Sequence, residues 1–150
     1  MFKSKIMKED FVPYDIAVKL KEKGFNEKCF AYYDVEDNVG LLYNTQYSDE
    51  ILPCQYTDLL ASYNSGNGEV HLDNSEYCID APTISQVLKW LRETKNIEVV
   101  ASFSYRNKVW GYQVGDMTLL EDSILSYDYS FPTYEEAALA GITYCLDNLI

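Results

Sequence analysis

The clearest hydrophobic pattern lies between residues 83 and 150, where a helical period gives way to strand periods and then returns. Apolar residues at helical spacing predict an amphipathic helix that begins at Thr83. They are Ile84, Val87, Leu88 and Leu91.

A second amphipathic helix is predicted after Thr133, because Glu136 follows it at capping-box spacing. Its apolar stripe is Ala138, Ile142, Cys145 and Leu149. Small residues beside that stripe would let this helix lie close to a neighbouring element, namely Ala137, Ala140 and Gly141.

Between these helices, apolar and polar residues alternate in three runs, as is typical of strands with one buried face. A two-residue turn at Arg106-Asn107 would pair the first two runs in an antiparallel hairpin. That register places the alternating apolar sets of both runs on the same face. The expected pairs are Val99 with Val114, Ala101 with Tyr112, Phe103 with Trp110, and Tyr105 with Lys108.

The third run alternates Leu125, Tyr127, Tyr129 and Phe131 with polar residues, which predicts a third strand. We expect four rings of this sheet to point toward the two helices: Phe103, Trp110, Tyr127 and Tyr129. The opposite face would then be polar and solvated. Its predicted members are Glu98, Ser102, Ser104, Gly111, Gln113, Ser126, Asp128 and Ser130.

The N-terminal half predicts a helix from Pro13 to Lys23, followed by a hairpin formed by residues 30–33 and 39–43. Gly24 stands where a left-handed residue would end the helix. The pattern is weakest between residues 44 and 81, where residues 76–79 fit a short strand. The predicted fold class is therefore α+β. A three-stranded antiparallel meander carries two helices on one face (α-β-β-β-α, residues 83–150), and an α-β-β subdomain precedes it.

The composition agrees with a packed core, since 47% of the residues are hydrophobic and 14 Tyr, 6 Phe and 2 Trp are present. With 150 residues, we expect a single domain, residues 1–150, or two packed subdomains, residues 11–80 and 81–150. The net charge of −12 disfavours direct contact with nucleic acids and anionic membranes, and it favours basic partners. No apolar run approaches the roughly 18 residues of a membrane span, and no secretory signal is evident. The expected location is the cytoplasm, with four reduced cysteines.

No motif predicts a catalytic, cofactor-binding or metal-binding residue. His71 is the only histidine, and no pair of cysteines at zinc spacing accompanies it. The carboxylates of residues 34–40 alternate as in a calcium loop, but glycine is missing at the sixth position and Thr45 stands at the twelfth. A hairpin turn explains them better. The glycines match neither a dinucleotide fingerprint nor a phosphate-binding loop, so no cofactor is predicted.

The α-β-β-β-α order resembles that of double-stranded-RNA-binding domains, which place lysines at the start of the last helix. Glu135 and Glu136 occupy that position here and would repel phosphates. RNA binding through this surface is therefore rejected.

Five stretches together resemble a family: residues 12–25, residues 29–33, residues 81–83, residues 89–93 and residues 134–137. They read VPYDIAVKLKEKGF, CFAYY, APT, KWLRE and YEEA. The family is that of the small uncharacterised proteins frequent in gut Bacteroides genomes, their phages and other mobile elements. The resemblance implies a cytoplasmic bacterial setting and a phage or mobile-element origin. It assigns a role to no residue.

Three functional hypotheses follow from the sequence. The favoured one is a non-enzymatic accessory or interaction protein that binds a protein partner or forms a homodimer, with Tyr47, Tyr56 and Tyr63 as candidate contacts. The alternative is an acidic decoy that occupies a basic nucleic-acid-binding site of a host protein, motivated by the net charge of −12. The second alternative is a small enzyme that uses His71 with a cysteine or a carboxylate.

Overall fold

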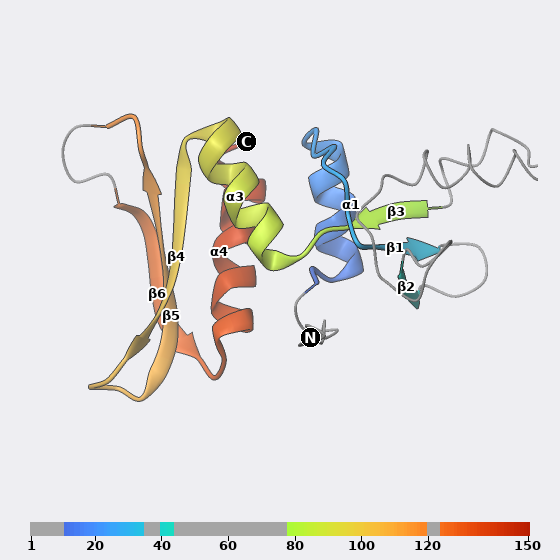
Figure 1. Cartoon of the computed structure of the whole chain (residues 1–150). Helices are drawn as coiled ribbons and strands as arrows, with labels where there is room; N and C mark the ends of the chain where they lie inside the picture. Colours follow the sequence, from blue (N-terminus) through green and yellow to red (C-terminus); the bar gives the residue numbers. More distant parts are fainter. Residues whose placement is uncertain (1–10, 35–39, 44–77, 120–123) are drawn as a thin grey trace, which may run out of the picture. The chain divides into compact units, whose positions relative to one another are not determined.

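The computed structural model describes residues 11–34, 40–43, 78–119 and 124–150 (Figure 1). The described residues belong to two compact units, and the boundary between the units falls between Thr83 and Ile84. The first unit contains the N-terminal helix and a small sheet. The second contains the longer sheet with the two remaining helices.

The first unit consists of one helix and three short antiparallel strands. They are α1 (Tyr14–Glu22), β1 (Ala31–Asp34), β2 (Gly40–Tyr43) and β3 (Cys78–Ala81), in the sheet order β2-β1-β3. The predicted hairpin is thus present as β1 and β2, and β3 adds a strand to the free edge of β1.

The two ends of α1 follow from local chemistry. Pro13 is the N-cap residue and not the first helical residue as predicted, because its ψ of 161° is extended. At the other end Gly24 has a φ of 87°. The Phe25 amide donates to the Leu20 carbonyl at 2.9 Å, and the Gly24 amide donates to the Lys21 carbonyl at 3.1 Å. These are the two hydrogen bonds of a Schellman ending, as the position of the glycine predicted.

The core of the first unit lies between α1 and the small sheet. Ile16, Ala17 and Leu20 are the buried residues of α1. The Tyr33 hydroxyl donates to the Val12 carbonyl at 2.7 Å, and both residues are buried. This hydrogen bond ties β1 to the segment that enters the helix, and it satisfies a carbonyl that would otherwise be removed from water.

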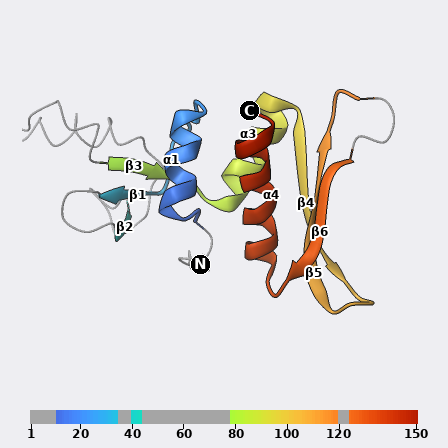
Figure 2. The same ribbon diagram turned by 180° about the vertical axis from the view of Figure 1, so that it is seen from behind.

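The second unit has the predicted α-β-β-β-α order. Its elements are α3 (Ile84–Lys95), β4 (Ile97–Ser104), β5 (Val109–Asp116), β6 (Ile124–Phe131) and α4 (Tyr134–Asn148). The strands form an antiparallel meander in the order β4-β5-β6. Figures 1 and 2 show both helices on the same side of this sheet, so the predicted fold class is confirmed.

The predicted pairing of β4 with β5 is also confirmed. Val99 pairs with Val114, Ala101 with Tyr112 and Phe103 with Trp110. The turn, however, has four residues, because Tyr105 to Lys108 lie outside the strands. Lys108 has a φ of 57°, and its amide donates to the Ser104 carbonyl at 2.8 Å. The longer turn leaves the register unchanged, since only the expected pair of Tyr105 with Lys108 is lost to the turn.

The prediction for β6 was wrong in its phase. Gln113 pairs with Tyr127 and Val114 pairs with Ser126, so Tyr127 shares a face with Gln113 and not with Val114. Tyr127 is 71% exposed. The register shifts between Trp110 and Tyr112, which brings Phe131 back opposite Trp110.

This phase reverses the expected faces of β6. Ser126 and Asp128, predicted on the solvated side, pair with residues of the helix-facing side. Tyr129, predicted on the helix side, accepts or donates a 3.0 Å hydrogen bond with Ser102 on the other side. Of the four rings predicted to face the helices, only Phe103 and Trp110 do so.

Helix α4 covers the sheet through small residues. Its buried residues are Ala137, Ala138, Gly141, Ile142, Cys145 and Leu146. A methyl group added at Gly141 would lie 2.6 Å from Val99 Cγ1 and 3.2 Å from the Tyr112 ring. The expectation of a close approach by this helix is therefore correct at Gly141.

The start of α4 also agrees with its prediction. The Thr133 hydroxyl accepts the Glu136 amide at 3.2 Å and lies 3.2 Å from the Glu136 carboxylate. This N-cap fixes the first turn of the helix immediately after β6.

Candidate interaction surfaces

The residues that the sequence singled out for function fall outside the part of the chain that the structure describes. Tyr47, Tyr56, Tyr63 and His71 all lie between residues 44 and 77, and the calcium-like carboxylates of residues 35–39 lie outside it as well. Their predicted roles stay predictions.

Within the described segments, no three His, Cys, Asp or Glu side chains gather closely enough to hold a metal ion. Cys29 and Cys145 are both buried. Burial raises the pKa of Cys145 to about 12, so its thiol is protonated at neutral pH. A nucleophilic cysteine has a lowered pKa and partial exposure, so Cys145 belongs to the core and not to a reactive site.

The face of the β4-β5-β6 sheet that points away from the helices is called the outer face here. Val100, Ser102, Gly111, Gln113, Tyr127 and Tyr129 contribute to it. Val100 is 45% exposed and Tyr127 is 71% exposed. The Tyr129 ring lies against Gly111, where an added methyl group would collide with it. This face is more apolar than expected, because the tyrosines of β6 belong to it.

The outer face carries little net charge. Glu98 shares its phase with Val100, and its carboxylate lies 3.5 Å from the Arg92 guanidinium of α3. Gln113 is exposed, and Ser102 is hydrogen-bonded to Tyr129. Aromatic and aliphatic side chains with few charges are typical of the centre of protein interfaces.

A second surface is a line of four rings, called the aromatic row here, which consists of Tyr105, Phe103, Trp110 and Tyr134. Successive ring centroids are 5.3, 5.4 and 5.6 Å apart, and all three contacts are edge-to-face. Tyr105 is 78% exposed and Tyr134 is 36% exposed, while Phe103 and Trp110 are half-buried. Figure 1 shows the β4-β5 turn and the start of α4 at the same end of the sheet.

The aromatic row has opposite charges at its two ends. Arg106 and Lys108 follow Tyr105 in the turn, and both are exposed. Glu135 and Glu136 follow Tyr134 in the first turn of α4, where carboxylates stabilise the helix dipole. Among the described residues, none of these four side chains is in an ion pair.

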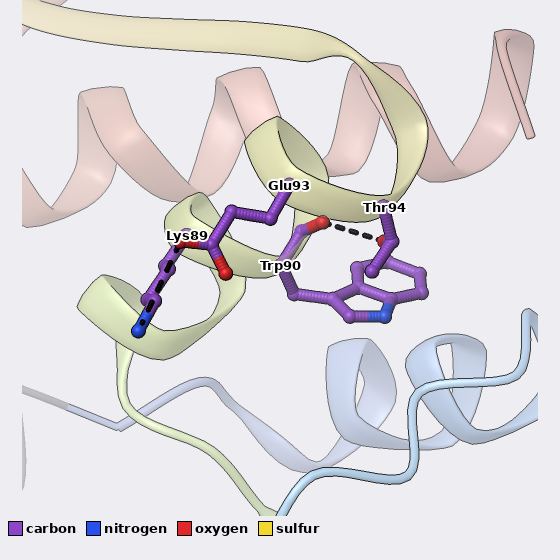
Figure 3. A network of polar contacts seen from close by, with 4 residues as sticks. All are labelled: Lys89, Trp90, Glu93 and Thr94. Carbon is purple, nitrogen blue, oxygen red and sulfur yellow. Dashed lines mark hydrogen bonds and ion pairs between the residues drawn. The ribbon is translucent and has the colours of Figure 1, made fainter.

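Charged side chains on α3, by contrast, have partners within the helix. Lys89 Nζ lies 3.9 Å from Glu93 Oε1 one helical turn away (Figure 3). In the same turn, the Thr94 hydroxyl donates to the Trp90 carbonyl at 2.6 Å (Figure 3). Lys95 Nζ lies 5.2 Å from the centre of the Trp90 ring. The charges beside the aromatic row have no ion-pair partner within the described residues.

Each of the two surfaces was predictable from the sequence only in part. The register of β4 and β5 predicted the contact between Phe103 and Trp110, but no pattern placed Tyr134 beside Trp110. Gly111 was the signal that could have revealed the phase of β6. A glycine in the centre of a strand often marks a close approach by a neighbour, which is the Tyr129 ring here.

Comparison with protein-family models, with curated proteins and with solved structures found no match. None of the helices that the structure describes combines the length and the apolar character needed to cross a membrane.

Proposed function

We propose that this protein is a non-enzymatic accessory protein that binds a partner protein through the outer face of its β4-β5-β6 sheet. The observation that supports the proposal is the exposure of Val100 and Tyr127 on a face with little net charge. Removal of both side chains from water in a complex would favour binding by about 25 cal/mol per Å² of buried apolar area. Tyr129 adds a ring that is already held in place by Ser102 and Gly111.

The setting of this function is proposed from the family resemblance. It is the cytoplasm of a bacterium, in a protein of phage or mobile-element origin. A protein of such an origin would find its partner among the proteins of the bacterial host.

The experiment compares four purified proteins as baits in a lysate of a gut Bacteroides species. They are the wild type, Val100→Lys, Tyr127→Lys and the control Met117→Lys. Met117 is 54% exposed in the turn after β5, so its substitution adds the same charge outside the three strands. We expect the wild type and the control to capture the same protein, and the two outer-face variants to lose it.

The proposal fails if all four baits retain the same protein, or if the wild type captures none. Far-UV circular dichroism spectra of the four proteins must coincide, so that a lost interaction is not mistaken for unfolding. The exposure of both substituted positions makes unfolding an unexpected outcome.

An acidic decoy is the second candidate function. Residues 44–77 contain six carboxylates and neither lysine nor arginine. They are Asp49, Glu50, Asp58, Glu69, Asp73 and Glu76. A decoy would compete with DNA or RNA for a basic partner, and replacement of all six by Asn or Gln would abolish that competition. A captured partner that binds nucleic acid equally well in the presence of this protein would exclude the decoy.

A further inference from the structure

We propose that the aromatic row is the contact surface of a homodimer, in which two copies of this chain meet across a two-fold axis. Arg106 and Lys108 of each copy face Glu135 and Glu136 of the other. This dimer goes beyond the proposed function, because the row follows the helix-facing side of the sheet whereas the partner-binding face is the outer one.

The aromatic row has the residue composition of a hot spot, the small group of residues that supplies most of the binding energy at a protein interface. Tryptophan, tyrosine and arginine are the residues that dominate binding energies at protein interfaces. Here Trp110 lies between Phe103 and Tyr134, with ring contacts of 5.4 and 5.6 Å on its two sides. Mutual contacts hold the rings in fixed orientations before binding, so less conformational entropy is lost on association. The 78% exposure of Tyr105 leaves one end of the row available to another molecule.

The charges determine which molecule fits. In a two-fold interface, the same patch on both subunits must complement itself. The row meets this condition, because cations flank its Tyr105 end and carboxylates flank its Tyr134 end. When the two-fold axis crosses the row at right angles, it reverses one row against the other, so each cationic end meets a carboxylate end.

Other occupants fit less well. A strongly acidic partner would be repelled by Glu135 and Glu136, and a strongly basic one by Arg106 and Lys108. Nucleic acid and anionic membranes would in addition meet a chain with a net charge of −12. The same net charge opposes association of two copies. At physiological ionic strength, however, screening over about 8 Å weakens the distant charges more than the close pairs.

The test measures the dimer dissociation constant by analytical ultracentrifugation for charge-reversal variants. We expect Arg106→Glu and Glu135→Arg each to weaken the dimer about tenfold or more. The double variant Arg106→Glu/Glu135→Arg restores the opposite charges across the axis, so its dissociation constant should return to within about threefold of the wild-type value. Neither a monomer nor an unrelated interface would produce this rescue.

Matched controls are available on α3. Lys89→Glu and Glu93→Arg make the same charge changes at side chains that are 64% and 61% exposed. They should leave the dissociation constant unchanged. Far-UV circular dichroism checks the fold of each variant, and Glu135→Gln repeats the test if arginine disturbs the first turn of α4.

Three results would overturn the homodimer. The first is a wild-type protein that stays monomeric up to about 1 mM, the range of very weak association. The second is a double variant as weak as the worse single variant. The third is loss of the dimer in Val100→Lys or Tyr127→Lys, which would place the contact on the outer face. Because those two variants leave the row intact, failure of the dimer and failure of the partner-binding proposal are distinguishable.

Discussion

Gly141 marks the point where α4 comes closest to the sheet, and its replacement by alanine gives the sharpest test of the fold. The added methyl carbon would lie 2.6 Å from Val99 Cγ1, closer than side chains normally approach, and 3.2 Å from the Tyr112 ring. We predict that Gly141→Ala destabilises the protein, although alanine is the better helix former.

Two opposing terms set the magnitude. Alanine in place of glycine in a helix interior favours folding by about 1 kcal/mol. Overpacking in a close-packed core costs about 1–3 kcal/mol. Val99 is buried and its branched side chain has few alternative rotamers, so the upper half of that range applies. The net loss of unfolding free energy should be about 1–2 kcal/mol, and each 1 kcal/mol lowers the melting temperature of a protein of 150 residues by about 2–4 °C.

The sign should reverse when Val99 is shortened. Val99→Ala removes the atom that the new methyl group would strike. It should itself cost about 2 kcal/mol, through two lost methyl groups and the cavity they leave. In that background, Gly141→Ala should stabilise the protein by up to about 1 kcal/mol, so the coupling between the two positions is about 2 kcal/mol.

Urea denaturation of the wild type, both single variants and the double variant, followed by tryptophan fluorescence, measures this cycle. Ala140→Gly serves as the control for helix propensity alone, because Ala140 is only half-buried in the same helix. If Gly141→Ala were stabilising in the wild type, or had the same effect in both backgrounds, α4 could not lie against β4 at this point.

The remaining predictions concern single groups. Tyr33→Phe should cost about 1–3 kcal/mol in urea denaturation, because the buried Val12 carbonyl loses its 2.7 Å hydrogen bond; an unchanged midpoint would contradict this. Thr133→Ala should cost about 1 kcal/mol in thermal unfolding, whereas Thr133→Ser should cost less than half as much; equal losses would exclude the N-cap. Cys145 should resist alkylation at pH 8 unless urea is present, as peptide mass spectrometry can show. Because burial raises its pKa from 9.0 to about 12, the unfolded thiol ionises first, and stability should fall between these pH values. Alkylation of Cys145 in the native protein would refute its burial.

Local patterns were sufficient wherever neighbouring residues determine the outcome. Gly24 ends α1 with the expected hydrogen bonds, and Thr133 caps α4 as its spacing with Glu136 indicated. The β4-β5 register was predictable because the position of the turn pairs Phe103 with Trp110, and that pairing places both alternating apolar sets on the same face. That register survived even though the turn between the strands is longer than expected.

Strand β6 shows where such patterns are insufficient. Tyr127 and Tyr129 alternate with polar residues as a buried face would, yet they lie on the outer face. A period of two says that two faces differ, but it does not say which face meets the helices. The irregular pairing near Trp110, which returns Phe131 to the helix side, is not predicted by the alternation, and Gly111 is the sequence feature that lies beside it.

The candidate surfaces depend on the same distinction. The sequence by itself determined the elements, their caps and the partnership of β4 with β5, because these follow from periods and spacings within a few residues. Only the tertiary structure decided that Tyr127 is exposed and that Tyr134 extends the ring contacts of Phe103 and Trp110. The physical reason is that side chains alternate across a strand. A one-residue change in pairing therefore moves every side chain to the other face, and it is set by contacts between segments far apart in the chain.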